Sequence, residues 1–418
     1  MKIPRVLCMF LLSVSLRAAQ ESPASALAEA LRKEDLPAVR AAVAASRQVL
    51  GDKAGVPEVA DKYSPLPGDG SWLSAADAQS GFAPHFAVLE KMRWWRVGID
   101  PATIPLPLRG PASVLSGNVA ACRAKLDGAD KSLAMAREAA EFLMWAQEQA
   151  GSGVFPFPAK RGASNDRAMS VGAAFLQRAE KSGKLDQLIR NGWAIDDLGD
   201  GGLQFDNGEC GVAMFEYYEL TRDAKALASA RRAADWAAAR PLATNWNYNS
   251  FSVHLLAKAF AVTGEQQYLE SAKKKALIGV LPGQLTDGPR AGRWLDPHNA
   301  RPAYHYIMLR ALAQLAAVLP ADDSSRSDVM RALTLGLKTR NAEILSQGAM
   351  NKDKVTETLL LVNTSFAGDA DFLRASLSAD ALDAMAKGIS AEARRGKNPL
   401  APREWGHFLE YIKARARP

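Results

Sequence analysis

Residues 210–236 read CGVAMFEYYELTRDAKALASARRAADW, and residues 252–278 read SVHLLAKAFAVTGEQQYLESAKKKALI. The two stretches align at an offset of 42 positions, which places Thr221 opposite Thr263. In each stretch an apolar helical run is followed by a short turn and by an amphipathic run with basic residues. An internal repeat of this kind predicts an array of helical hairpins.

The two helices of each unit differ in their apolar pattern. Apolar residues fill nearly every turn of 212–220, which is typical of a helix buried on most sides, whereas 225–237 carries one apolar stripe. The same order recurs more loosely at 168–185 and 302–338, and strand signals are nearly absent. Pro- and Gly-rich breaks separate the pairs. We therefore expect an all-α fold of about six to seven helical hairpins in a single large domain.

The N-terminal residues have the pattern of a secretory signal peptide. Lys2 and Arg5 precede the apolar run 6–16 (VLCMFLLSVSL), and small residues follow at Ala18 and Ala19. A retained N-terminal helix is the alternative. The expected division is a signal peptide at 1–19, an N-terminal helical segment and linker at 20–75, and the hairpin domain at 76–418. The expected location is secreted or periplasmic.

Charge and cysteine content exclude several classes of protein. The chain has 52 Lys and Arg against 45 Asp and Glu, a net charge of +7 that falls to +4 without residues 1–19. A nearly neutral chain is a poor candidate for a nucleic-acid binder. No later stretch is apolar and long enough to enter a membrane.

Of the three cysteines, Cys122 and Cys210 remain after signal removal and can form one disulfide or none. No metal site and no cofactor are predicted.

Three features together resemble the α/α-toroid proteins of the six-hairpin glycosidase-like group. They are the turn 153–158 (GVFPFP), the run 200–206 (DGGLQFD) and the repeat described above. The resemblance covers roughly residues 80–390 and is architectural, with no family-specific catalytic signature. It implies inner and outer helices around a barrel, with a glycan-handling cleft formed by loops at one end. It does not supply the reaction, because one fold hosts many chemistries.

The first candidate site is 203–210 (LQFDNGEC), at the predicted start of an inner helix. Asp206 and Glu209 are carboxylates of the kind that act as acid and base on a glycosidic bond. The alternative is structural: Asp206 or Asn207 caps the helix, and Glu209 complements the helix dipole.

The second candidate site is 245–249 (NWNYN), before the next inner helix. Aromatic rings cover the apolar faces of sugars, and amides bind pairs of hydroxyl groups. This pattern predicts substrate binding by Asn245, Trp246, Asn247 and Tyr248. An aromatic-stapled helix cap with asparagines in turn conformations is the alternative.

The third candidate site is the densest in polar and aromatic residues, 290–310 (RAGRWLDPHNARPAYHYIMLR). Asp296, His298 and Tyr304 are its candidate catalytic residues, as proton donor and as bases. Its candidate substrate-binding residues are Arg293, Trp294, Asn299 and Arg301, the arginines as ligands of a substrate carboxylate. Asp296 before Pro297 is also an ordinary turn starter, and Arg301 before Pro302 can simply bind carbonyls. His305 lies on an apolar stripe and is predicted to be a core residue, and His254 and His407 are interpreted as structural.

The main functional hypothesis is a monomeric, exported glycoside hydrolase that acts on a poly- or oligosaccharide through Asp206, Glu209 and Asp296. A polysaccharide lyase that acts on a uronate with a His or Tyr base is the first alternative. A non-catalytic helical glycan-binding or scaffold protein is the second. A cytoplasmic sugar epimerase is a third possibility, which would require a pair of catalytic histidines in the cavity and no signal peptide.

Overall fold

The computed structural model describes residues 22–60, 71–80, 109–125, 129–150, 155, 157–158, 181, 194–195, 202–348, 354–395 and 401–415. Nearly all of the regular structure in these ranges is helical. The N-terminal part contains α1 (Pro23–Arg32), α2 (Leu36–Leu50), η1 (Gly51–Lys53), α4 (Arg109–Arg123) and α5 (Ala129–Ala150). The middle part contains α8 (Gly202–Thr221), α9 (Ala224–Ala239), α10 (Trp246–Thr263), α11 (Gln266–Gly279) and η3 (Leu281–Gly283). The C-terminal part contains α12 (Pro302–Val318), α13 (Arg326–Gln347), α14 (Val355–Ser365), α15 (Ala370–Ala375), α16 (Ser378–Arg394) and α17 (Pro402–Arg415).

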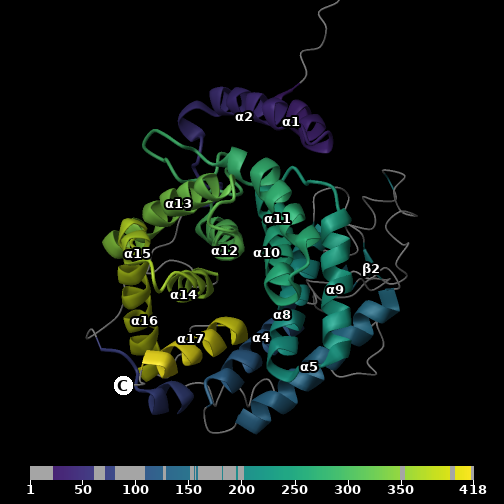
Figure 1. Ribbon diagram of the computed structural model, residues 1–418. Helices are drawn as coiled ribbons and strands as arrows, with labels where there is room; N and C mark the ends of the chain where they lie inside the picture. The colour runs from purple at the N-terminus through teal and green to yellow at the C-terminus, as the bar shows by residue number, and fades with distance from the viewer. Residues whose placement is uncertain are drawn as a thin grey trace, which may run out of the picture.

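Six of these helices form a closed inner ring. Helices α4, α8, α10, α12, α14 and α17 each pack against the next, and α17 packs against α4. Helices α5, α9, α11, α13 and α16 lie outside the ring, each against its preceding inner helix (Figure 1). The predicted all-α toroid is confirmed. The described strands are β1 (Phe157–Pro158) and β2 (Ala194–Ile195), which pair antiparallel with Phe157 opposite Ile195.

The repeat found in the sequence corresponds to two hairpins, α8 with α9 and α10 with α11. The outer helix α9 turns a stripe of buried small residues inward: Ala226, Ser229, Ala230, Ala233, Ala234 and Ala237. The inner helices also approach closely, because a Cβ atom on Gly208 of α8 would lie 2.8 Å from the Cβ of Phe251 on α10. Small residues at these positions therefore allow the hairpins to stack into a ring.

The inner helices run in the same direction, so that all of them begin at one end of the ring. On α8 and α10, Gln204 lies beside Ser252 and Gly211 beside Leu255. On α4 and α17, the Oγ of Ser113 accepts a hydrogen bond from the backbone N–H of Arg403. We call the end where the inner helices begin the N-terminal mouth.

The N-terminal hairpin of α1 and α2 lies outside the ring (Figure 1). It packs beside α11 and η3, and Lys274 of α11 forms an ion pair with Glu34 at 2.8 Å. The predicted signal peptide and the predicted hairpin at 168–185 fall almost wholly outside the described residues. No helix in the described ranges has both the length and the apolarity needed to span a bilayer.

Candidate functional site

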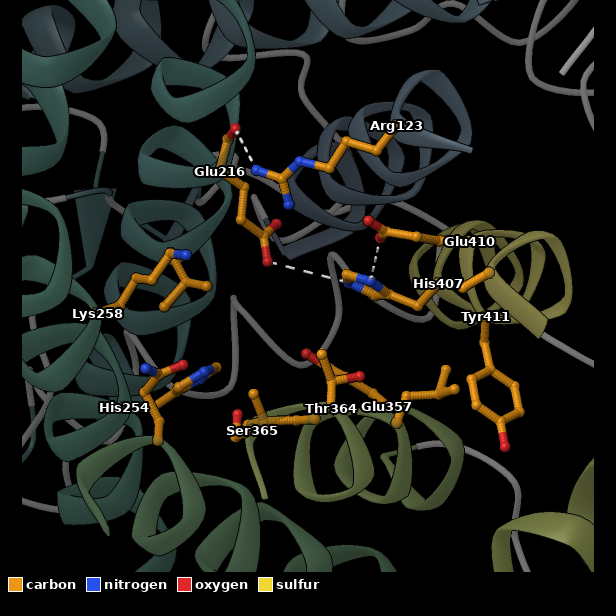
Figure 2. A pocket seen from close by; sticks show the side chains of 15 residues that line it. Arg123, Glu216, His254, Lys258, Glu357, Thr364, Ser365, His407, Glu410 and Tyr411 are labelled. Atoms are coloured by element: carbon orange, nitrogen blue, oxygen red, sulfur yellow. Dashed lines mark hydrogen bonds and ion pairs between the residues drawn. The ribbon is translucent and has the colours of Figure 1, made fainter. Parts of the chain in front are cut away.

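A cavity of about 450 Å³ lies inside the ring, and all six inner helices contribute to its wall. Its volume is within the range of small-molecule sites. The titratable residues that line it include Glu216, His254, Lys258, Glu357, His407 and Glu410 (Figure 2). Two histidines and three glutamates therefore surround one space, which we call the axial cavity.

His254 enters the axial cavity from α10, and its side chain is buried. Burial lowers the pKa of this imidazole well below its usual value, and the positive charges of Arg310 and Lys258 lower it further. His254 is therefore neutral near pH 7. A neutral imidazole has a free lone pair and can accept a proton.

His407 lies on α17, on the opposite side of the inner ring from α10. Its Nδ1 lies 3.8 Å from a carboxylate oxygen of Glu410, and its Nε2 lies 3.9 Å from one of Glu216. Burial alone would lower the pKa of His407, but the interaction with Glu410 and the charges of Glu216 and Glu357 outweigh it and raise the pKa. His407 therefore favours the protonated form, in contrast to His254.

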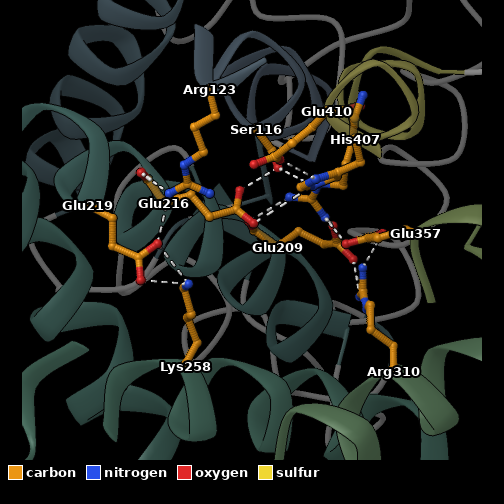
Figure 3. Close-up of polar contacts among 12 residues, drawn as sticks. Ser116, Arg123, Glu209, Glu216, Glu219, Lys258, Arg310, Glu357, His407 and Glu410 are labelled. Carbon is orange, nitrogen blue, oxygen red and sulfur yellow. Dashed lines mark hydrogen bonds and ion pairs between the residues drawn. The ribbon is translucent and has the colours of Figure 1, made fainter. Parts of the chain in front are cut away.

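Two cations at the cavity wall share one carboxylate. The Nη2 of Arg123 and the Nζ of Lys258 each donate to Glu219 at 2.9 Å (Figure 3). Arg123 comes from α4 and Lys258 from α10, so Glu219 of α8 joins three inner helices. Arg123 and Lys258 carry two positive charges and Glu219 carries one negative charge, so the three side chains together have a net charge of +1.

A layer of buried ion pairs lies beside the axial cavity, toward the N-terminal ends of the inner helices. Glu209 accepts from Arg310 at 2.6 Å and from Lys354 at 3.0 Å, and it also pairs with Arg403. Glu357 accepts from Arg310 at 2.7 Å. We call these five residues the charged layer (Figure 3).

Asp206, predicted from the sequence as a catalytic acid, lies inside α8 rather than at its cap. The helix begins at Gly202, so the capping interpretation of Asp206 is wrong, and Asn207 instead accepts a hydrogen bond from the backbone of Phe155. Asp206 is 2% exposed, and one carboxylate oxygen lies 3.6 Å from the Nε of Arg109. Burial raises the pKa of Asp206 to about 6 against the opposing charge of Arg109.

The predicted substrate-binding run at 245–248 forms the start of α10. Asn245 is the N-cap, and its side chain accepts from the backbone N–H of Asn247, as the structural alternative proposed. Trp246 is buried against Gly283, while Tyr248 is half-buried. The side chain of Asn247 is 1% exposed and has no hydrogen-bond partner in the described structure.

The segment 293–304 lies between the ring and the N-terminal hairpin. Asn299 donates to both carboxylate oxygens of Asp296 at 3.0 Å and to Asn245 at 3.0 Å. Arg293 pairs with Glu343 of α13, and the indole of Trp294 is fully buried and donates to a backbone carbonyl of residue 280. These contacts place Asp296, Asn299 and Asn245 in one hydrogen-bonded group.

His298, Arg301 and Tyr304 form a separate group. The ring of His298 stacks on Tyr304 at 4.6 Å, and the guanidinium of Arg301 lies 4.0 Å from the Tyr304 ring. His298 and Arg301 both contact Glu58 at 3.2 Å. This predicted site therefore binds the N-terminal segment, and none of its residues lines the axial cavity.

Other predictions concern single residues. His305 is a buried core residue, as predicted, and its Nε2 lies 2.7 Å from the carbonyl oxygen of Gly292. Cys122 and Cys210 are free thiols. Within the described ranges, no three His, Cys, Asp or Glu side chains are arranged to hold a metal ion.

The cavity residues His254, His407 and Glu216 were not among the candidates predicted from the sequence. The sequence interpretation of both histidines is structural, although Lys258 follows His254 by four positions and Glu410 follows His407 by three. These two helical spacings are the local signal that could have identified them. Their other partners, such as Glu216 beside His407, come from other inner helices and leave no local pattern.

Comparisons with known proteins support the fold. No family model matches the chain, and no curated protein sequence is significantly similar to it. Among solved structures, a polysaccharide lyase is similar with a TM-score of 0.50 and 14% identity, over 82% of this chain and 97% of its own. A glycosyl hydrolase family 88 protein from Bacteroides vulgatus has a TM-score of 0.47 and 13% identity, over 82% and 99% of the two chains. A cellobiose 2-epimerase from Spirochaeta thermophila has a TM-score of 0.48 and 12% identity, over 82% and 96%.

The chain therefore has an α/α-toroid fold, as its sequence predicted. The likeness to the lyase extends over nearly the whole of that protein at low sequence identity. At this identity it establishes the fold and leaves the chemistry to the residues of the site.

Proposed function

We propose that this protein is a carbohydrate-active enzyme that binds a saccharide in the axial cavity and transforms it by general acid–base catalysis. The observation that carries the proposal is the pair of histidines on opposite sides of this cavity. Their surroundings shift their pKa values in opposite directions, so that His254 is neutral and His407 is protonated at the same pH. Titratable pairs with opposed pKa shifts are typical of acid–base sites.

The reaction that fits this pair best is β-elimination from a uronate-containing glycan. His254 would remove the proton beside the carboxyl group, and His407 would protonate the leaving glycosidic oxygen. Lys258 and Arg123 would stabilise the negative charge that develops on the substrate carboxyl group. The fold is one that a polysaccharide lyase also uses.

Hydrolysis is the second candidate, and Asp206 is the residue that favours it. Its pKa of about 6 suits a proton donor near neutral pH. The other two carboxylates predicted for hydrolysis have strong partners: Glu209 binds Arg310, Lys354 and Arg403 in the charged layer. Asp296 accepts two hydrogen bonds from Asn299. A hydrolytic site would therefore need a second carboxylate besides these two.

The remaining parts of the proposal concern location and assembly. We propose that the chain is exported through its N-terminal 19 residues and acts as a monomer on a poly- or oligosaccharide. The basic and apolar pattern of those residues supports export.

The decisive experiment is a screen of the purified protein against acidic and neutral polysaccharides. Elimination creates a double bond that absorbs in the near ultraviolet, whereas hydrolysis produces only new reducing ends. We expect near-ultraviolet absorbance with a uronate polymer and its loss, by at least about 100-fold, in His254→Gln and His407→Gln. Glu270→Gln, which changes an exposed residue of α11, is the matched control.

Three outcomes would contradict the proposal. Reducing ends without absorbance would favour hydrolysis. Binding without turnover would favour a glycan-binding protein. Loss of activity in His298→Ala with full activity in His254→Gln would move the chemistry from the axial cavity to the outer segment 293–304.

A further inference from the structure

The residues that line the axial cavity become more exposed toward one end of the ring. On α17 the side chain of His407 is 19% exposed and that of Glu410 is 38% exposed, and Ala414 in the last turn is also exposed. On α14, Glu357 in the first turn is buried, whereas Thr364 in the last turn is exposed (Figure 2). The cavity therefore opens at the end of the ring where the inner helices terminate, which we call the C-terminal mouth.

The other side of the axial cavity consists of buried side chains. Val212 of α8 and His254 of α10, each near the middle of its helix, line the cavity and are buried. Glu209 of the charged layer lies one turn before Val212 on α8 and is buried too. The two candidate sites predicted on α8 and α10 lie at the beginnings of these helices, so the opening of the cavity faces the opposite end of the ring.

Tyr411 of α17 lines the cavity beside this opening and is half-buried. It follows His407 by four positions, so both side chains lie on one face of the helix. The ring of Trp72 lies 5.5 Å from the Tyr411 ring, at an angle of 43°. The indole N–H of Trp72 donates a hydrogen bond to Asp383 at 2.9 Å. A fixed aromatic neighbour therefore supports the Tyr411 ring at the edge of the cavity.

We propose that the axial cavity receives its saccharide at the C-terminal mouth, and that Tyr411 stacks on the sugar joined through the leaving oxygen. In the proposed function His407 protonates this oxygen, and Tyr411 lies one turn nearer the opening on the same helix face. An aromatic ring offers an apolar face to a sugar ring. The choice of a saccharide and the role of His407 rest on the proposed function, whereas the position of the opening does not.

The other groups at the C-terminal mouth suit the hydroxyl groups of a sugar. The hydroxyl groups of Thr364 and Ser365 and the amide of Gln314 line the cavity, and each can donate and accept hydrogen bonds. His254 and Lys258 are less exposed and lie further inside. The proposed reaction therefore places the uronate at the inner end of the cavity and the leaving part of the glycan on the solvent side.

The position of the opening is tested by blocking each end of the ring in turn. Thr364→Cys lies at the C-terminal mouth, and Ala401→Cys replaces an exposed residue directly before α17, at the N-terminal mouth. Each variant also carries Cys8→Ser and Cys122→Ser, and the remaining Cys210 is buried. The rigid reagent N-(1-pyrenyl)maleimide therefore labels the introduced thiol.

Diethyl pyrocarbonate modifies accessible, neutral imidazoles, and peptide mass spectrometry measures the modification of each histidine. We expect the label on Thr364→Cys to prevent the modification of His254 and His407. The label on Ala401→Cys should leave their modification as it is in the unlabelled chain. His298, which is partly exposed and does not line the cavity, is the internal reference and should react in every sample.

The role of Tyr411 is tested by saturation-transfer NMR with short oligosaccharides of galacturonate, mannuronate and glucuronate. The His254→Gln chain is the parent, so that no probe is consumed. We expect it to bind at least one of these probes, and Tyr411→Ala to weaken that binding by at least about 10-fold. Tyr411→Phe retains the ring and should bind more tightly than Tyr411→Ala. The control is Tyr218→Ala, which changes a half-buried residue of α8 outside the cavity and should bind as the parent does.

Each part of the inference has a result that would overturn it. Unchanged modification of the cavity histidines in labelled Thr364→Cys, or no modification in the unlabelled chain, would show that the cavity does not open at the C-terminal mouth. Equal binding by the parent and Tyr411→Ala, or no binding by the parent, would exclude Tyr411 as a sugar-binding residue. A chain that turns over no glycan but shows the expected protection of both histidines would overturn the proposed function and keep the position of the opening.

Discussion

The Nη1 of Arg310 donates a hydrogen bond to the Oε2 of Glu357 across 2.7 Å, and so links inner helices α12 and α14 inside the ring. Both side chains are buried. Arg310 also donates to Glu209 of α8, which does not adjoin α12 in the ring. The charged layer therefore joins helices across the barrel interior as well as neighbours within the ring.

Removing this arginine should destabilise the fold strongly. Arg310→Met leaves the carboxylates of Glu209 and Glu357 buried with fewer cations, and we expect the free energy of unfolding to fall by about 3–5 kcal/mol. Urea unfolding measures this change. The control is Arg331→Ala, which removes an exposed pair with Asp328 and should change stability by less than about 0.5 kcal/mol. Equal stability of Arg310→Met and the native chain would mean that the layer contributes nothing.

The two cavity histidines predict a bell-shaped dependence of kcat/KM on pH. Activity requires His254 neutral and His407 protonated. Because the pKa of His254 is lowered, activity should fall on the acid side only well below pH 6.5. Because the pKa of His407 is raised, activity should fall on the alkaline side only above pH 6.5.

Glu410→Gln tests which group controls the alkaline limb. The carboxylate of Glu410 is the main group that raises the pKa of His407, so its removal should shift this limb to lower pH and leave the acid limb in place. The profile of Glu270→Gln should match that of the native enzyme. An alkaline limb that does not move in Glu410→Gln would exclude His407 as the acid.

The sequence was sufficient for the architecture because inner and outer helices have different apolar patterns. The run 212–220 is apolar in every turn and lies within an inner helix, and 225–237 has one stripe and lies within an outer one. The offset of 42 positions then placed the next hairpin correctly. These are local properties of the chain, and they persist in the folded protein.

The candidate site was less predictable for two physical reasons. First, His254 and His407 form one site only because the ring places α10 and α17 opposite each other and brings Glu216 of α8 and Arg123 of α4 to the same cavity. Second, a polar connection such as 290–301 can line the ring interior or bind an outer element, and its composition is the same in both cases. Here it binds the segment that follows the N-terminal hairpin, where Glu58 contacts His298.

Asp206 should oppose folding at neutral pH. Its pKa is 3.8 in an ordinary setting and about 6 in the folded chain, so the unfolded chain releases this proton more readily. The carboxylate therefore destabilises the fold above pH 3.8, and does so fully above about pH 6. The difference between the two pKa values corresponds to about 3 kcal/mol.

Asp206→Asn removes this charge at every pH. We expect the variant to be more stable than the native chain by about 2–3 kcal/mol at pH 8. The gain should shrink as the pH falls toward 4, where the native carboxyl group is neutral in the folded chain. Urea unfolding at several pH values measures both chains under the same conditions. A gain that does not depend on pH would show that burial does not raise the pKa of Asp206.

The closure of the ring depends on two facing glycines, Gly117 of α4 and Gly406 of α17. A Cβ atom on Gly406 would overlap the carbonyl group of Gly117, and one on Gly117 would overlap that of Pro402. Gly406→Ala should therefore separate these helices and lower the free energy of unfolding by at least about 3 kcal/mol, although alanine favours a helix more than glycine does. Gly368→Ala is the control, because a Cβ there meets no atom within 4 Å. Because His407 follows Gly406 directly, the separation should also displace the acid of the axial cavity, and activity should fall even where the variant remains folded. A fully stable and active Gly406→Ala chain would contradict the closed ring on which both sites depend.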